Sequence, residues 1–324
     1  MAGHDLRRVL SRAGSWSRTW GIVRRLVAGV LVAASLAAAA GCGGESRDAA
    51  PPETQPPPET SPPSSAPSPL PPPSRPMSWA TAGAFVWHET DVSPEVLGEE
   101  LRDSGFGWVA VLVHDGLVED PVEDDWVARF RSASGLPVGG WGVLRAQPVE
   151  EAVLADALVG RYGLDFYIAN AEAEYAYSGT DGPNDERFGR SRRFVEAFRA
   201  VRPVLPAGVS SYCSPDRHDL DWNAWSSAGF VFLPQAYVND FGAAVAPEAC
   251  VRAASAYFPT TAVHPTIGMY TGVRRSLRAA GYTRLLDRAG TVGFSVYLAE
   301  TRMTGDEWRD LGEAIEELGI ARPT

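Results

Sequence analysis

From Met77 onward, short apolar runs alternate with stretches whose apolar residues recur at helical spacing. The runs are rich in β-branched and aromatic residues, and almost every position in them is apolar, as expected for strands buried on both faces. Eight such runs predict strands: Ala84–Trp87, Trp108–Val113, Val138–Leu144, Phe166–Ala171, Gly208–Tyr212, Phe230–Ala236, Pro265–Tyr270 and Gly293–Leu298.

The stretches between the runs carry helix signals. Ser93 before Pro94 predicts a helix start, and Gly105 predicts its end. Thr304–Glu307 has the pattern of a capping box. A helix over Trp222–Ala228 is short and poorly marked. Two apolar stripes at helical spacing predict buried helix faces: Val149, Val153, Leu154 and Leu158, and Phe194, Val195, Phe198 and Val201.

Strands that alternate with helices predict parallel pairing, because each parallel connection needs a crossover. Residues 77–324 are close in number to the roughly 250 residues of a typical (β/α)8 barrel. The sequence therefore predicts the α/β class and a (β/α)8 TIM barrel over 77–324. The competing architecture is an open doubly wound sheet, but no glycine-rich phosphate loop follows the first predicted strand.

The first 41 residues have the organisation of an export signal. Arginines precede an apolar run from Leu26 to Ala40, which is too short for a typical membrane-spanning helix. The sequence Ala39-Ala40-Gly41-Cys42 then resembles the bacterial lipobox, with alanine where leucine is usual three positions before the cysteine. The resemblance implies cleavage before Cys42 and its lipidation, with the protein held on the outer face of the cytoplasmic membrane. The alternative is an ordinary signal peptide followed by a chance cysteine.

Residues 42–76 are rich in proline and serine and poor in apolar side chains. Because proline removes backbone donors and little can pack, this composition predicts a disordered tether between the membrane and the barrel.

Charge excludes one class of partner. The chain has a net charge of −11 although six of its arginines lie within residues 1–25, so the rest is strongly acidic. Such a surface repels phosphate backbones, and we expect no nucleic-acid partner. The histidines lack metal-ligand spacing, so we expect no metal, and we expect no other cofactor. No Gly-x-Ser-x-Gly motif occurs, which argues against a serine hydrolase. We also expect the protein to be a monomer.

In a (β/α)8 barrel the site lies at the carboxyl ends of the strands. The fourth predicted strand runs into Asn170, Glu172 and Glu174, which alternate with alanines and therefore share a face. Two nearby carboxylates repel, so one is expected to have a raised pKa and act as an acid while the other stays ionised. Glycosidases use such a pair. The alternative is that both glutamates are solvated residues of the rim.

Other strand ends supply aromatic and polar groups that suit a sugar, through stacking on its faces and hydrogen bonds at its edge. The candidate substrate-binding residues are Asn170, Trp87, Trp141, Gln235, Tyr237, Asn239, Tyr270, Tyr297 and Glu300.

The end of the fourth strand resembles the carboxylate rows of exported barrel glycoside hydrolases: the Asp-x-Glu pair of family 25 muramidases and the Asp-x-x-Asp-x-Asp-x-Glu row of family 18 chitinases. On the second pattern, the four positions are occupied by Tyr167, Asn170, Glu172 and Glu174, of which only the last matches in type. Gln235-Ala236-Tyr237 is similar to the Met-x-Tyr of the same family.

The pair and the resemblance together imply a cell-envelope hydrolase of a polysaccharide or of the peptidoglycan glycan, with Glu174 as proton donor and Glu172 as partner carboxylate. The alternative is a glycan-binding lipoprotein on the same barrel that does not cleave. Outside the cytoplasm two cysteines near one face of a barrel usually pair, so we also expect a disulfide between Cys213 and Cys250.

The anchoring hypothesis has a direct test. Cys42→Ser removes the thiol that would receive the lipid, so we expect an uncut precursor or a released soluble protein, and loss of partitioning into detergent. Wild-type protein recovered wholly in the aqueous phase would contradict lipidation.

Overall fold

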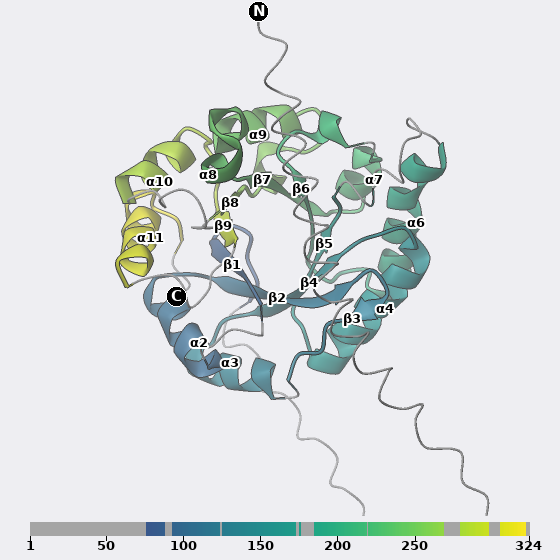
Figure 1. Ribbon diagram of the computed structural model, residues 1–324, viewed down its shortest axis with the longest axis horizontal. Coiled ribbons are helices and arrows are strands. Elements are labelled where there is room, and N and C mark those ends of the chain that lie inside the picture. Colours follow the sequence, from purple (N-terminus) through teal and green to yellow (C-terminus); the bar gives the residue numbers. More distant parts are fainter. Residues whose placement is uncertain are drawn as a thin grey trace, which may run out of the picture. The chain divides into compact units, whose positions relative to one another are not determined.

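The computed structural model describes residues 76–87, 93–123, 125–172, 175, 185–218, 220–268, 279–297 and 305–321. Among these residues, eight parallel strands form a closed barrel, and the helices form a ring around it (Figure 1). The strands are β1 (Ala82–Val86), β2 (Trp108–Asp115), β4 (Val138–Val143), β5 (Tyr167–Asn170), β6 (Ala207–Tyr212), β7 (Val231–Ala236), β8 (Thr266–Gly268) and β9 (Phe294–Tyr297).

Closure depends on β1, which pairs in parallel with β2 on one side and β9 on the other. Gly83 lies opposite Trp108, and Ala82 lies opposite Phe294. The remaining strands follow chain order around the barrel. All eight predicted strands are confirmed, and the closed (β/α)8 barrel excludes the open doubly wound sheet.

The helices pack their apolar faces against the outside of the barrel, in a core that includes β-strand and helix residues alike. They are α2 (Pro94–Asp103), α3 (Trp126–Ser134), α4 (Pro148–Tyr162), α6 (Asp185–Val201), α7 (Trp222–Ser227), α8 (Val238–Phe241), α9 (Pro247–Ala254), α10 (Ala279–Asp287) and α11 (Gly305–Glu317). Single 3-10 turns lie at η1 (Pro215–Arg217), η2 (Ala243–Val245) and η3 (Thr260–Ala262).

The start of α2 follows from the sequence. Ser93 Oγ accepts a hydrogen bond from Val96 N at 3.4 Å, and Pro94 occupies the first helical position, where its missing N–H costs nothing. After the helix, Gly105 adopts φ 85°, a conformation that glycine reaches without strain.

The predicted buried face of helix α4 is wrong in part. Val149 and Val153 are 43% and 60% exposed, whereas Ala152, Ala155 and Leu158 are buried. The side chain of Glu151 is also fully buried. The helix is therefore rotated relative to the predicted face, because small alanines allow it to pack closely on the barrel and Glu151 has partners there.

A short hairpin was not predicted. Strand β3 (Val118–Glu119) runs antiparallel to the end of β2, pairing His114 with Glu119. Gly116, at φ 59°, makes the turn between the two strands. The two-residue strand is too short to leave an apolar pattern.

The amino-terminal end of the barrel is filled by aromatic rings. Trp79, just before β1, packs edge-on against Trp108 and Phe166 at ring-centre distances of 5.5 and 5.6 Å. Room for Trp108 comes from Gly83, where a Cβ would overlap the indole. His264, buried beside them, donates from Nδ1 to the carbonyl oxygen of Trp79 at 2.9 Å. We call Trp79, Trp108, Phe166 and His264 the aromatic plug.

Cys213, which follows β6, forms a disulfide with Cys250 of α9, and their Cα atoms are 4.8 Å apart. This separation lies within the usual 4.4–6.8 Å range. The bond ties the connection after β6 to the helix that precedes β8. Within the part of the chain that the structure describes, no helix has both the length and the apolar character needed to cross a membrane.

The aromatic plug makes stability depend on pH. Burial lowers the pKa of His264 from 6.5 to about 4. Between these values the unfolded chain binds a proton that the folded protein does not, so His264 destabilises the fold as the pH falls from 6.5 towards 4. We expect His264→Asn to reduce the loss of unfolding free energy between pH 7 and pH 4 by up to about 3 kcal/mol. Chemical denaturation at both pH values measures it, and an equal loss in both proteins would contradict it.

Candidate functional site

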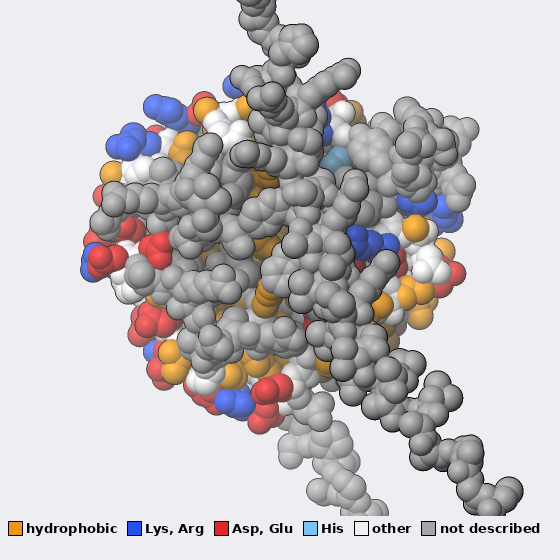
Figure 2. Space-filling model, viewed as in Figure 1, with side chains coloured by type: hydrophobic (Ala, Val, Ile, Leu, Met, Phe, Trp, Pro, Cys, Tyr) orange, Lys and Arg blue, Asp and Glu red, His pale blue; other side chains and the backbone are white. Residues whose placement is uncertain are grey.

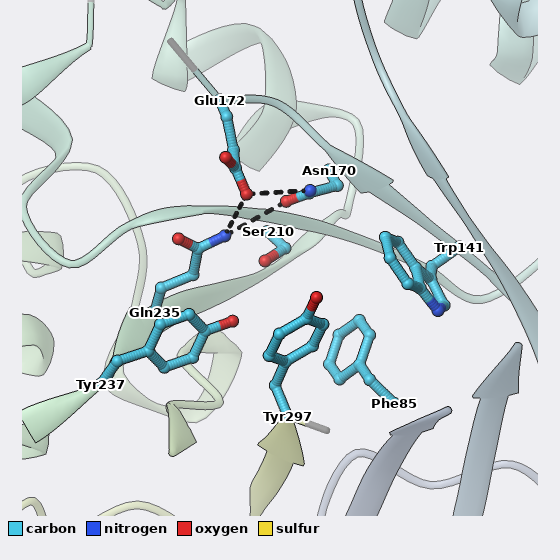
Figure 3. A pocket seen from close by; sticks show the side chains of 8 residues that line it. All are labelled: Phe85, Trp141, Asn170, Glu172, Ser210, Gln235, Tyr237 and Tyr297. Atoms are coloured by element: carbon cyan, nitrogen blue, oxygen red, sulfur yellow. Dashed lines mark hydrogen bonds between the residues drawn. The ribbon is translucent and has the colours of Figure 1, made fainter. Parts of the chain in front are cut away.

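An open pocket lies at the carboxyl ends of the barrel strands, opposite the aromatic plug. Its volume is about 320 Å³, including the solvent at its mouth. Figure 3 shows polar groups on one side of the pocket and aromatic rings on the other. The lining residues are Phe85, Trp141, Asn170, Glu172, Ser210, Gln235, Tyr237 and Tyr297.

Glu172 is held in place by two amide side chains. Its Oε1 accepts a hydrogen bond from Asn170 Nδ2 at 3.0 Å and one from Gln235 Nε2 at 2.8 Å. Gln235 Nε2 also lies 3.3 Å from Asn170 Oδ1, so the three groups form one network (Figure 3). Asn170 and Gln235 are nearly buried, at 8% and 9% exposure, whereas Glu172 is half-buried. The carboxylate is thus fixed through one oxygen at the boundary between the core and the pocket.

The aromatic side has two parts. The rings of Tyr237 and Tyr297 stack at 5.6 Å with an interplanar angle of 18°. Phe85 and Trp141 meet edge-on at 6.0 Å, and each also contacts Tyr297 edge-on. Trp141 Nε1 donates to the carbonyl oxygen of Val86 at 3.2 Å, which fixes the indole. These rings form a rigid apolar surface facing the carboxylate network.

Strand alternation explains how these groups meet. Asn170 ends β5 with its side chain toward the barrel axis, and Glu172, two residues on, points the same way, while Ala169 and Ala171 pack in the outer core. On β7 the same alternation places Gln235 and Tyr237 at the pocket. The predicted common face of Asn170 and Glu172 is therefore observed.

The other predicted residues divide into groups. Four of these candidate residues line the pocket: Trp141, Gln235, Tyr237 and Tyr297. Trp87 packs against the barrel interior without lining the pocket. Asn239 lies in α8, and nothing is described of its side chain. Outside the described residues lie Cys42, Glu174, Tyr270 and Glu300.

Phe85 and Ser210 were not among the predicted site residues. Residues two apart in a strand share a face. Phe85 lies two residues before Trp87, and Ser210 lies two residues before Tyr212, so the aromatic residues at these strand ends could have indicated both. Phenylalanine and serine inside an apolar run carry no signal of their own, because both also occur in ordinary strands.

The described lining of the pocket offers one ionisable carboxylate for chemistry. Glu172 is the one charged side chain among the described lining residues. Within the described ranges, no cluster of three or more His, Cys, Asp or Glu residues is arranged to hold a metal ion. Figure 2 shows hydrophobic side chains near the centre of the face and charged side chains mainly around the outer helices.

The barrel is similar to several solved structures. A class V chitinase from Nicotiana tobaccum shares 10% identity over 74% of this chain and 99% of that chain, with a TM-score of 0.55. The catalytic domain of a hyperthermophilic chitinase from Pyrococcus furiosus shares 11% over 76% and 97%, also at 0.55. A chitinase-like agglutinin from Robinia pseudoacacia shares 8% over 72% and 99%, at 0.51. At sequence identities this low, structural similarity shows that the chains share a fold and does not show a shared activity.

No model of a protein family matches the chain, and no curated protein matches it. The chain therefore has the fold of a (β/α)8 barrel that chitinases also have, and its activity has to be argued from the pocket.

The amide–carboxylate network makes a testable prediction. Gln235→Glu places a second carboxylate where an amide donor lies 2.8 Å from Glu172 Oε1. Two carboxylates at that distance cannot both ionise cheaply, so we expect this variant to be about 2–4 kcal/mol less stable than wild type at pH 8. Below about pH 4 the difference should shrink, because the added carboxyl is then protonated. Denaturant unfolding at both pH values measures it.

The matched control is Gln235→Leu, which also removes both hydrogen bonds but adds no charge. Its stability relative to wild type should differ little between pH 8 and pH 4. Equal pH responses of the two variants would show that Gln235 does not contact the carboxylate.

Proposed function

We propose that the barrel is a glycoside hydrolase of the cell envelope, acting on a polysaccharide or on the glycan of peptidoglycan. The observation that carries the proposal is the position of Glu172, fixed by Asn170 and Gln235 opposite a surface of aromatic rings. A sugar ring offers apolar faces for stacking and hydroxyl groups at its edge, and the pocket supplies partners for both.

In this proposal Glu174 is the proton donor and Glu172 the partner carboxylate. Hydrolysis of a glycosidic bond needs one carboxylic acid to protonate the leaving oxygen, and one carboxylate to attack the sugar carbon or activate water. Glu172 suits the second task, since its Oε1 is fixed by two amide donors. Among the described residues Oε2 has no hydrogen-bond partner and remains available to substrate or water. Glu174 follows it by two residues on the same predicted row.

The cellular setting belongs to the proposal as well. The arginine-rich start, the apolar run and Cys42 support an exported lipoprotein anchored on the outer face of the cytoplasmic membrane. In this proposal the protein acts as a monomer. An enzyme in this position would meet the polymers of the cell wall.

The second candidate function is glycan binding without cleavage. It is favoured by Asn170, an amide at a position where a family 18 row has an aspartate, and by the amides that already engage Oε1. This barrel is similar to a chitinase at a TM-score of 0.55 and to a chitinase-like agglutinin at 0.51, so the fold alone does not separate binding from catalysis.

Four variants separate these functions. Under the hydrolase proposal, Glu174→Gln and Glu172→Gln each lower the release of reducing ends from chitin oligosaccharides or peptidoglycan by at least about 100-fold. Both variants keep glycan affinity within a few-fold by calorimetry, because the aromatic surface is unchanged. Tyr237→Ala weakens binding, since it removes one ring of the stacked pair. Glu196→Gln, an exposed carboxyl on α6, is the control and leaves both measurements unchanged.

The binding alternative predicts a different pattern. Wild-type protein then binds glycan without turnover, and only loss of an aromatic ring reduces affinity. Turnover that persists in both Glu174→Gln and Glu172→Gln would refute the assigned roles.

A further inference from the structure

A second set of polar side chains lies behind the barrel wall, between the outer faces of the strands and helices α4 and α6. Glu151 and Arg190 belong to this set, and neither lines the pocket. Each nevertheless contacts the backbone of a connection that follows a barrel strand: Glu151 after β4 and Arg190 after β5. Buried charges are costly unless they are paired or hydrogen-bonded, so a buried Glu and a buried Arg in one region require an explanation.

The segment after β5 is fixed at its two ends. At one end, the side chain of Glu172 is bound by the amides of the pocket floor. At the other, the ring of Tyr175 is fully buried in the core between barrel and helices. The two residues are also joined through the backbone, because Tyr175 N donates to Glu172 O at 3.0 Å. Glu172 and Tyr175 are thus each fixed by their side chains and joined to each other by their backbones.

Arg190 binds the backbone at Tyr175. It lies in α6 and is 6% exposed, and its Nη1 donates to the carbonyl oxygen of Tyr175 at 2.8 Å. A guanidinium that gives up water to bind a backbone carbonyl makes a strong, directional contact, because its donors lie in a rigid plane. This hydrogen bond joins α6 directly to the segment that carries the candidate carboxylates.

Glu151 of α4 provides the opposite charge. Its Oε1 accepts from Arg145 N at 2.8 Å, in the connection after β4. Burial raises the pKa of Glu151, and the backbone donors and the positive charge of Arg190 oppose that rise. Burial, followed by the charge of Glu151, raises the pKa of the Tyr175 hydroxyl well above its usual value. Glu151, Tyr175 and Arg190 therefore lie within electrostatic range of one another.

The same cluster reaches a third strand end. Arg145, whose backbone binds Glu151, forms two side-chain hydrogen bonds with Asp115 at the end of β2, at 2.6 and 2.9 Å. Connections after β2, β4 and β5 are thus linked from behind the barrel wall. Arg145 and Asp115 are 39% and 34% exposed, whereas Glu151 and Arg190 are buried, so the part of the cluster next to β5 is the better shielded from solvent.

We propose that Arg190 is a positioning residue that holds the backbone at Tyr175 and, through the hydrogen bond from Tyr175 N to Glu172 O, keeps the Glu172 carboxylate in the pocket. The inference rests on the proposed function of Glu172 and Glu174. Arg190 itself touches no substrate. Arg190 acts through its hydrogen bond to the Tyr175 carbonyl oxygen, and Tyr175 N in turn donates to Glu172 O.

The experiment compares Arg190→Met with Arg190→Lys and with Arg192→Met as a matched control. Arg192 is on the same helix, but its side chain is 62% exposed and makes no hydrogen bond or ion pair with Tyr175 or Glu172; it pairs with Asp221, whose side chain is 7% exposed. The first measurement is hydrogen exchange of the Tyr175 amide, which reports directly on its bond to Glu172 O. We expect Arg190→Met to speed this exchange at least about 10-fold while core strands exchange as in wild type, and Arg192→Met to change nothing.

The second measurement is kinetic. Since a small displacement of catalytic groups can cost about 100-fold in rate, we expect Arg190→Met to lower kcat by about 10–100-fold while KM changes less than about 3-fold. Arg190→Lys keeps the charge and one donor, so it should recover part of both losses. If Arg190→Met does not fold, Arg190→Lys gives the test, with exchange of the Tyr175 amide between that of wild type and that of unfolded chain.

The outcomes separate this inference from the hydrolase proposal. Wild-type protein without turnover overturns the hydrolase alone, and faster Tyr175 exchange in Arg190→Met then still supports the positioning role. Exchange equal to wild type in Arg190→Met and Arg190→Lys overturns the positioning role, as does faster exchange spread evenly over the barrel, which marks a general loss of stability.

Discussion

The interior of an eight-stranded parallel barrel is just wide enough to be filled by side chains, and the way it is filled decides where a site can form. In this protein large rings fill the amino-terminal part, and glycine at position 83 makes room for Trp108. Towards the carboxyl ends, amides, a serine and a carboxylate join the aromatic rings. The pocket lies where the purely apolar filling of the interior ends.

Polar groups at that depth are stable only because they satisfy one another. Asn170 and Gln235 are almost fully buried, and each finds its partner in the other or in Glu172. The half-buried carboxylate is thereby oriented by the interior of the barrel, while α6 holds the following backbone from outside through Arg190. Side chain and main chain of the same short segment are thus fixed by different layers of the fold.

The sequence was informative where local pattern and tertiary structure agree. Strands buried on both faces need apolar residues at nearly every position, which is why all eight could be recognised. Alternation along a strand likewise predicted that Asn170 and Glu172 share a face. The pocket residues Phe85 and Ser210 were missed because their types are common in any strand.

The errors arose where long-range contacts decide. Val149 and Val153 were expected in the core, but α4 instead turns Glu151 inward. That carboxylate is stabilised by backbone N–H groups of the preceding connection, which leave no trace in a hydrophobic pattern. Arg190 is equally invisible in sequence, since its partner is a backbone carbonyl 15 residues away.

The aromatic plug also gives the barrel a polarity. The described chain enters beside Trp79, at the amino-terminal end, while the pocket opens at the carboxyl-terminal end. Whatever precedes Pro76 is therefore joined to the barrel a full strand length from the pocket mouth. Pulling on that connection would load the plug and the first strand, and would leave the rim of the pocket unstrained. A surface attached at the amino-terminal end would thus leave the mouth of the pocket accessible from the opposite side.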